Sequence, residues 1–449
     1  MQRATIFSRP LWQSVWAYGI VAIAACGCAP QAPAPAAPAA SPPQPPPASV
    51  AAADAPSSAT PAADRSSGGA TTQEPPPAYF NPLTPEQIAD GWASLFDGHT
   101  LFGWVANKPE VNWSVKDGVI TADSGPIGLL NTYVPFADFE LACEFEMEAD
   151  GNSGVFLRTL ADPSDVKKDC YELNIADAHP DGFTTGAIVG HAKTAAPIKG
   201  SGGWKKLHVR VEGNRFVVTL DGEQVLDYTD ETRARSSGLI GLQKNKGKVA
   251  FRNIVLKPLS LTDLFNGADT AGWRVVPGSK SEFAVDDGTI HLQNGPGFLE
   301  TEQQYGDFVF QCDAQTHGDK LNSGFFFRAM PGTEQRRQTA TKCRSTMALR
   351  EMTGPNRRIP ERARSSGARQ RGVVSSDHEW CTITLVADGN RFMTWVNGYP
   401  VTDWTDDRKP DENPRKGRRD AAGHISLQGH DATTDISFRR LKIAELPAE

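Results

Sequence analysis

The sequence lacks several features that mark common classes of protein. Its 449 residues carry a net charge of −7, so there is no basic excess of the kind that a nucleic-acid-binding face needs. Its seven cysteines include no paired CxxC spacing, which excludes a zinc ribbon and a disulfide-dense scaffold. No glycine-rich nucleotide-binding motif occurs, so we expect no nucleotide cofactor. Only 39% of the residues are hydrophobic, which predicts a sizeable non-globular segment.

Glycine and proline are plentiful, at 41 and 33 residues, while methionine is scarce at 6. This balance favours short strands and many turns over long helices. The length allows two or three domains. Residues 27–80 consist almost entirely of Ala, Pro, Ser, Gln and Thr, and such a segment buries too little apolar surface to offset its chain entropy. We therefore expect a disordered tether there.

The first 26 residues resemble an export signal. Arg3 and Arg9 precede an apolar run that is too short and interrupted to be a good membrane span. The run ends in Ile-Ala-Ala before Cys26, which resembles a bacterial lipobox with Cys26 as the lipidated residue. An ordinary signal peptide ending near Ala29 is the alternative. Either interpretation predicts an exported protein, and the favoured one predicts an envelope lipoprotein held by a lipid anchor.

The remaining chain contains one pattern written twice, about 170 residues apart. Asp117-Gly118 and Asp287-Gly288 each form a two-residue hairpin signal between alternating strands. The segments 152–158 and 322–328 both begin with Asn-Ser-Gly and both end with Arg. This spacing exceeds any solenoid period and predicts tandem domains, 81–258 and 259–449. The alternation predicts antiparallel β-sandwiches, preceded by one helix capped by Thr84.

These motifs as a set resemble the 3-keto-disaccharide hydrolase family. The resemblance rests on the helix start, the Leu-Phe-Asp-Gly and Gly-Trp motifs, Asn-Ser-Gly at 152–154 and Tyr171-Glu172, and it covers nearly the whole chain after the tether. It implies an all-β chain of two concanavalin-A-like jelly-roll sandwiches acting on carbohydrate, with a pocket near the strand that carries Glu172.

A sugar oxidised at C3 has an acidic proton at C2, and removing that proton requires a base and a group that stabilises the enolate. We expect Glu172 to be the general base or acid and Arg158 to clamp the substrate or enolate. His179 or His191 is the candidate for the second proton transfer. The alternative is that Arg158 and Glu172 are only an ion pair across strands.

Four further residues are candidates for substrate binding. Asn174 shares a strand face with Glu172, because side chains on one face repeat every two residues. Asn152 begins the matched segment, where a special turn is the alternative role. Arg328 is the second copy's equivalent of Arg158. Trp104 is a candidate for stacking on a sugar, although buried sandwich tryptophans are commoner.

Metal ligands are not clearly indicated. Asp177, His179 and Asp181 alternate in a predicted loop and are the candidates for a structural or catalytic divalent metal. Acidic loops of this kind are more often solvated, so we expect no metal there. Cys143 and Cys312 occupy equivalent strand positions and are interpreted as small core residues.

The second copy contains a stretch of different character at residues 336–371. Ten of these 36 residues are Arg, none is Asp, and no counterpart of Tyr171-Glu172 is present. Synonymous codons for residues 340–348 can be chosen so that the reading frame one nucleotide earlier encodes Gly-Tyr-Glu-Val-Gln-Ile-His-Asn-Gly. This peptide contains the strand motif that the second copy lacks. The hypothesis is a pair of compensating frameshifts; a basic surface loop is the alternative. If the protein is made with this stretch, the second copy lacks its carboxylate and the first copy is the better candidate for activity.

The sequence therefore predicts an envelope-anchored enzyme that cleaves glycosides, with 3-keto-glycosides as the expected substrates. A pair of non-catalytic carbohydrate-binding domains is the alternative, since two linked sites gain avidity.

Overall fold

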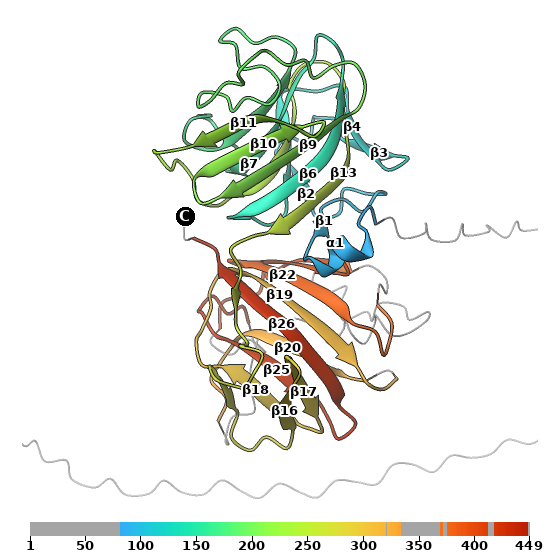
Figure 1. Ribbon diagram of the computed structural model, residues 1–449, viewed down its shortest axis with the longest axis vertical. Helices are drawn as coiled ribbons and strands as arrows, with labels where there is room; N and C mark the ends of the chain where they lie inside the picture. Colours follow the sequence, from blue (N-terminus) through green and yellow to red (C-terminus); the bar gives the residue numbers. More distant parts are fainter. Residues whose placement is uncertain (1–80, 320, 334–368, 371–374, 412–416, 448–449) are drawn as a thin grey trace, which may run out of the picture. The chain divides into compact units, whose positions relative to one another are not determined.

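The computed structural model describes residues 81–319, 321–333, 369–370, 375–411 and 417–447 (Figure 1). The predicted export signal, Cys26 and the tether lie outside these residues, as does nearly all of the 336–371 segment. In the part of the chain that is described, no helix is long and apolar enough to cross a bilayer.

The predicted helix is present as α1 (Pro85–Ala89). Thr84 is its N-cap: the Thr84 hydroxyl accepts a hydrogen bond from the Gln87 amide, and the Gln87 side chain accepts one from the Thr84 amide. Pro85 occupies the first helical position, where its missing N–H is not needed. The sequence-based prediction of this start is confirmed.

The first sandwich packs two antiparallel sheets. Within residues 81–258, all of which are described, the larger sheet has eight strands in the order β11-β10-β9-β6-β13-β4-β3, with β1 also pairing with β13. The smaller sheet has five strands in the order β2-β5-β12-β7-β8. The bounds in the larger sheet are β1 (Ala93–Ser94), β3 (Ser114–Lys116), β4 (Val119–Ala122), β6 (Phe139–Met147), β9 (Lys205–Glu212), β10 (Arg215–Leu220), β11 (Glu223–Thr229) and β13 (Val249–Pro258). Those in the smaller sheet are β2 (Trp104–Ala106), β5 (Gly128–Thr132), β7 (Asn152–Thr159), β8 (Tyr171–Ala176) and β12 (Leu239–Lys244).

The second sandwich repeats this plan. Among the described residues its larger sheet has the order β16-β17-β26-β19-β22-β23-β24-β21, with β14 pairing with β26, and its smaller sheet has the order β15-β18-β25-β20. The bounds in the larger sheet are β14 (Thr262–Asp263), β16 (Glu282–Asp286), β17 (Thr289–Gln293), β19 (Phe308–Thr316), β21 (Arg369–Gln370), β22 (Cys381–Asp388), β23 (Arg391–Val396), β24 (Tyr399–Thr405) and β26 (Asp435–Glu445). Those in the smaller sheet are β15 (Trp273–Val275), β18 (Gly297–Thr301), β20 (Ser323–Ala329) and β25 (His424–Gly429). The predicted pair of jelly-roll sandwiches is confirmed.

The Asp-Gly hairpins form as the sequence predicts. Asp117 and Gly118 have φ of 50° and 76°, and Asp287 and Gly288 have φ of 43° and 68°. Two consecutive left-handed residues match the twist of the strands they connect, which is why Asp-Gly is favoured at these positions. The first turn joins β3 to β4 and the second joins β16 to β17.

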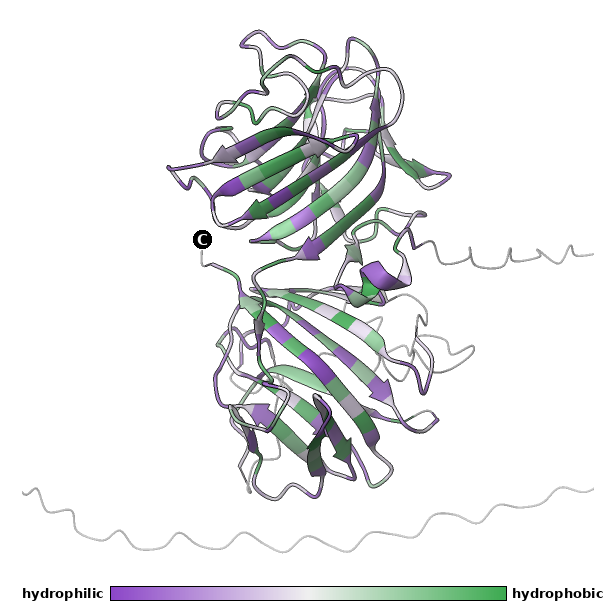
Figure 2. Cartoon of the chain, in the orientation of Figure 1, coloured by the Kyte–Doolittle hydropathy of each residue, from purple (hydrophilic) through white to green (hydrophobic). Residues whose placement is uncertain are grey.

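Each core lies between the two sheets of its sandwich. The strands carry alternating hydrophobic and hydrophilic bands, so each sheet turns one face inward (Figure 2). Cys143 and Cys312 are 3% and 1% exposed, which confirms that both are core residues. Cys170 and Cys381 are also buried free thiols.

The smaller sheets of the two sandwiches differ at one edge. In the first, β7 pairs with β8, which carries Tyr171 and Glu172. In the second, β20 is equivalent to β7, but no strand pairs with its other side among the described residues. The strand motif that the sequence of the second copy lacks is thus also missing from the described part of its sheet.

Candidate active site

The candidate site lies on the outer face of the five-stranded sheet of the first sandwich. Tyr171, Leu173 and Ile175 of β8 belong to the hydrophobic core. Because side chains alternate along a strand, Glu172 and Asn174 point to the opposite face. The predicted shared face of these two residues is therefore present.

Glu172 is a buried carboxyl group on this face. The residue is 8% exposed, and burial raises the pKa of its side chain to about 7, although a hydrogen bond with the Gln243 side chain opposes the shift. Its Cγ and Oε1 lie close to Gly154 on the neighbouring strand, at 3.3 and 3.4 Å from where a Cβ would stand. Glycine at position 154 thus leaves the space that the carboxyl group occupies. A carboxyl group that titrates near neutral pH is suited to both accept and donate a proton.

Amide side chains without complete hydrogen bonding share the sheet with Glu172. The side-chain oxygens of Asn131, Asn152 and Gln243 are buried and have no hydrogen-bond partner in the protein. Gln243 lies on β12 and Asn131 on β5, and both belong to the smaller sheet that also holds Glu172. Unsatisfied buried acceptors are costly, so their concentration on one face indicates a place where donor groups of a ligand bind.

Asn174 holds a covering loop in place. Its side-chain amide donates to the carbonyl of Phe183, and its backbone amide donates to the carbonyl of Ala187 at 2.9 Å. The residue is 1% exposed. Asn174 therefore positions the loop that follows β8, and its contact with substrate stays a prediction.

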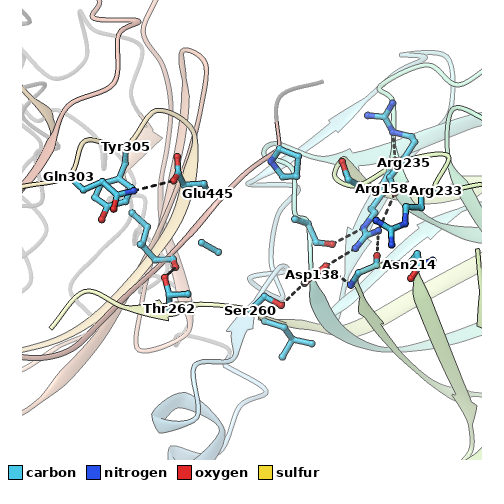
Figure 3. Close-up of a pocket in the computed structure, with 17 residues that line it drawn as sticks. Asp138, Arg158, Asn214, Arg233, Arg235, Ser260, Thr262, Gln303, Tyr305 and Glu445 are labelled. Atoms are coloured by element: carbon cyan, nitrogen blue, oxygen red, sulfur yellow. Dashed lines mark hydrogen bonds and ion pairs between the residues drawn. The ribbon is translucent and has the colours of Figure 1, made fainter. Parts of the chain in front are cut away.

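Arg158 does not converge with Glu172. Its guanidinium is 1% exposed, pairs with Asp138 at 2.8 Å, and donates to the carbonyls of Ala137, Gly213 and Arg235 (Figure 3). The backbone at Arg158 is left-handed, with φ of 48°, and the pairing of β7 with β12 shifts register next to it. This break in alternation turns the side chain over the core ring of Phe216, 5.9 Å from its centroid. The predicted clamp formed by Arg158 beside Glu172 is therefore wrong in this structure.

Arg328 forms the same arrangement in the second sandwich. Its φ is 46°, it is 1% exposed, and it pairs with Asp307 at 2.5 Å. It also donates to the carbonyls of Gly306 and Gly389. Because the guanidinium nitrogens are all engaged inside the protein, the predicted substrate contact of Arg328 is wrong, and both arginines tie the ends of strands together.

Trp104 is also a structural residue. It is 7% exposed, belongs to the core cluster, and its indole N–H donates to the carbonyl of Leu95 at 2.7 Å. Trp273 repeats the contact with the carbonyl of Leu264 at 2.7 Å. The predicted stacking of Trp104 on a sugar is wrong, because its ring is enclosed by the sandwich.

The two candidate histidines contact different residues. His191 packs against Tyr171, with ring centroids 5.1 Å apart, and its Nε2 is buried without a partner. Since Tyr171 points to the core side of β8, His191 is not placed beside Glu172. His179 follows β8 and packs edge-on against Phe183 at 5.6 Å, next to the carbonyl that Asn174 holds. His179 thus contacts the loop that Asn174 holds.

The acidic loop does not form a three-ligand group among the described residues. The Asp177 carboxylate accepts hydrogen bonds from the Gly200 amide and from the amide and hydroxyl of Ser201, at 2.5–3.0 Å. These bonds hold the pKa of Asp177 below its usual range, although burial opposes them. Asp177 therefore fastens the loop, and His179 accepts a local bond from the Asp181 amide at 3.2 Å.

Sequence reasoning missed Gln243 and Asn131. Gln243 follows from comparing the copies, because Gly241-Leu242-Gln243 matches 426–428 and Gln428 has the same unpartnered buried oxygen, whereas the position of Asn131 holds Glu300 in the second copy. Asn322, the equivalent of Asn152, also has one. A polar residue repeated in both copies between core positions was the available signal.

The fold defines a protein of two tandem jelly-roll β-sandwiches. The chain belongs to the 3-keto-alpha-glucoside-1,2-lyase-like family, whose sequence profile matches residues 91–257 and 260–444. A 3-keto-disaccharide hydrolase from Bacteroides thetaiotaomicron is 26% identical, over 38% of this chain and 79% of that protein.

Two solved structures are also similar. A Parabacteroides distasonis protein described as a candidate glycosyl hydrolase is 21% identical, over 40% of this chain and 98% of its own, with a TM-score of 0.36. The carbohydrate-binding module CBM66 from Bacillus subtilis is 20% identical, over 34% of this chain and 95% of its own, with a TM-score of 0.29.

Proposed function

We propose that the first sandwich cleaves 3-keto-glycosides by removing the proton next to the ketone, with Glu172 as the base. The observation that carries the proposal is the buried Glu172 carboxyl group, whose pKa is raised to about 7 on a face with unpartnered amide oxygens. The printed names of the family and of the Bacteroides relative, a lyase-like domain and a 3-keto-disaccharide hydrolase, support the same substrate class.

The reaction balances as an elimination. The Glu172 carboxylate takes the proton from C2, and the electrons of that C–H bond form an enolate with the C3 carbonyl. The carbonyl then re-forms, a double bond forms between C1 and C2, and the C1–O bond breaks. The departing alkoxide takes up a proton and leaves as a free sugar or alcohol. Later addition of water across the double bond completes a hydrolysis.

Sugar hydroxyls fit the remaining polar groups of this face. The oxygens of Asn131, Asn152 and Gln243 are acceptors, and hydroxyl groups are donors that would satisfy them. Gln243 has a second role, because its side chain also bonds Glu172 and so orients the carboxyl group. The same face thus offers hydroxyl recognition next to a proton acceptor.

The test is to incubate the full chain with 3-keto-trehalose or 3-keto-lactose and measure the free sugar released. Glu172→Gln removes the base while keeping the side chain's size, and we expect turnover to fall by about 10²–10⁴-fold. Glu212→Gln is the matched control, because Glu212 is an exposed carboxylate paired with Arg210 on the other sheet. Equal turnover in wild type and Glu172→Gln would refute the role of Glu172.

The pH profile gives a second measure of the same group. The base must be ionised, so kcat/KM is expected to rise as the pH passes through about 7 and to level off above it. A profile that is flat between pH 5 and 9 would contradict Glu172 as the base.

Carbohydrate binding without catalysis is the second candidate, and the second sandwich favours it. Asn322 and Gln428 keep the unpartnered oxygens of the first copy, while the described part of the second sheet has no strand in the place of β8. Binding of the unoxidised disaccharides, without release of sugar from the 3-keto forms and unchanged in Glu172→Gln, would support this function for the whole chain.

We further propose that the protein is exported and held at the cell envelope by lipid on Cys26. The sequence before Cys26 supports this, since small residues precede a cysteine after a short apolar run. Labelling of cells with a fatty acid should mark the wild type and not Cys26→Ser. Equal labelling of the two would exclude lipid attachment at Cys26.

A further inference from the structure

The second sandwich carries a cluster of metal-binding side chains on its larger sheet. His291, His317 and Asp435 each offer one ligand atom, and these atoms all lie within 4.8 Å of one another. It is the one such three-ligand group among the residues that the structure describes. The cluster is partly open to solvent, since His291 and Asp435 are 34% and 35% exposed.

Three neighbouring strands of the larger sheet bring the cluster together. His291 of β17 pairs with Ser437 of β26, and Asp435 stands two residues before Ser437 on the same face. His317 directly follows β19, and its amide donates to the carbonyl of Asp435 at 2.9 Å. The side chains therefore meet on the outer face of the sheet, while Ile290, Ile436 and Phe438 fill the core behind them.

The present contacts hold the rings close to the positions that a metal requires. His291 Nε2 lies 2.6 Å from Asp435 Oδ1, and His317 Nε2 lies 2.7 Å from the Ser437 hydroxyl. The two imidazole rings are edge-to-face at 5.1 Å. Bonds of 2.0–2.2 Å to a tetrahedral zinc separate its ligands by about 3.3 Å. The three ligand atoms, which lie within 4.8 Å of one another, would have to close by about 1.5 Å at most to reach this spacing.

We propose that His291, His317 and Asp435 bind one divalent transition-metal ion, for which Zn²⁺ is the probe. Imidazole and carboxylate together suit Zn²⁺ and its neighbours better than Ca²⁺ or Mg²⁺, which prefer oxygen ligands throughout. Three protein ligands leave a fourth position for water, next to the Ser437 hydroxyl. The ion joins β17, β26 and β19, and thereby fixes the β16–β17 hairpin to the rest of its sheet.

The first sandwich provides an internal contrast. In the first copy, Thr121 is equivalent to His291, because Thr121 pairs with Ala250 as His291 pairs with Ser437. The Glu148 amide donates a hydrogen bond to the Lys248 carbonyl, just as the His317 amide donates one to the Asp435 carbonyl. The equivalent positions thus hold Thr121, Glu148 and Lys248, which supply no imidazole and include a cation. The proposed site belongs to the second copy alone.

The test is calorimetric titration of Zn²⁺ into the full chain after treatment with a chelator. We expect one ion per chain, with binding weakened at least about tenfold in His291→Ala, in His317→Ala and in Asp435→Asn. The matched control is His208→Ala, because His208 of β9 is also a partly exposed strand histidine, 3.2 Å from a single carboxylate, Glu140.

A thermal measurement separates loss of the site from loss of folding. Zn²⁺ should raise the unfolding temperature of the wild type and of His208→Ala, and should leave that of the three site variants unchanged. If Zn²⁺ does not bind, or binds equally well to His291→Ala and His317→Ala, the proposed site is wrong.

Discussion

The two sandwiches share their framework and differ in the chemistry on their surfaces. Each has a buried, left-handed arginine paired with a more exposed aspartate, Arg158 with Asp138 and Arg328 with Asp307. Each also has a buried tryptophan whose indole is bonded to a carbonyl nine residues earlier. What occurs in both copies therefore includes the interactions that hold strand ends and loops together, and these are not evidence for catalysis.

The differences point to divided roles. Only the first copy presents a strand with a buried carboxyl group of raised pKa within the described residues, and only the second brings two histidines and an aspartate together. The unpartnered amide pair, Asn152 with Gln243 and Asn322 with Gln428, is common to both. The comparison separates a shared sugar-facing surface from features that one copy has and the other lacks.

The largest expected effect tests the shared framework. Arg158→Met and Arg328→Met each leave two or more carbonyls without their donor, and each should reduce the free energy of unfolding by about 3–5 kcal/mol, since every unsatisfied buried acceptor costs about 1–3 kcal/mol. Urea denaturation measures this. Arg210→Met, which breaks an exposed pair with Glu140, should change it by about 1 kcal/mol or less. If Arg158→Met were as stable as the wild type but inactive, Arg158 would have a role in catalysis and not only in stability.

A smaller expected effect is the pH dependence of stability that Glu172 gives to the first copy. The pKa of Glu172 is raised from an ordinary 4.5 to about 7, so the folded state binds this proton more tightly than the unfolded state. The resulting stability is fully present below pH 4.5 and is lost as the pH rises through about 7; it amounts to roughly 3 kcal/mol. Glu172→Gln should therefore be more stable than the wild type at pH 8 and similar to it near pH 4.

Urea denaturation of both proteins at the two pH values measures this difference. A stability gain in Glu172→Gln that is the same at pH 4 and pH 8 would show that burial of the charge is not its source.

The smallest expected effect tests whether the hairpins are truly equivalent. Gly118 and Gly288 have φ of 76° and 68°, and an added Cβ at either would meet no atom within 4 Å. Substitution by Ala should cost only the backbone strain, roughly 1 kcal/mol in each copy. Gly306→Ala is the control, since Gly306 has open space but no positive φ. Unequal losses at 118 and 288, measured by thermal unfolding, would show that the two turns differ.

Much of the fold could be predicted because its signals are local. The Asp-Gly turns, the Thr84 cap and the strand alternation each depend on a few adjacent residues. Alternation also placed Glu172 and Asn174 on one face correctly. The alternation rule failed at Arg158, because the left-handed backbone there reverses the direction of the side chain. An arginine in the sequence does not predict a left-handed conformation.

The remaining parts of the site depend on contacts between distant segments. Burial of Trp104 depends on its bond to Leu95 and on the sheets closing around it, which alternation alone does not establish. Gln243 is 71 residues from Glu172 along the chain and reaches it only through strand pairing. The histidine–aspartate cluster likewise joins strands up to 144 residues apart, so no motif search along the sequence would find it.

The buried thiols give each sandwich its own chemical reporter. Burial raises the pKa of Cys143, Cys170 and Cys381 to about 12 and that of Cys312 well above its usual range, so alkylating reagents meet no thiolate while the sheets stay closed. Pulse alkylation followed by mass spectrometry would assign each labelled peptide to one sandwich or the other. The opening rates of the two halves can therefore be followed separately in a single uncut chain.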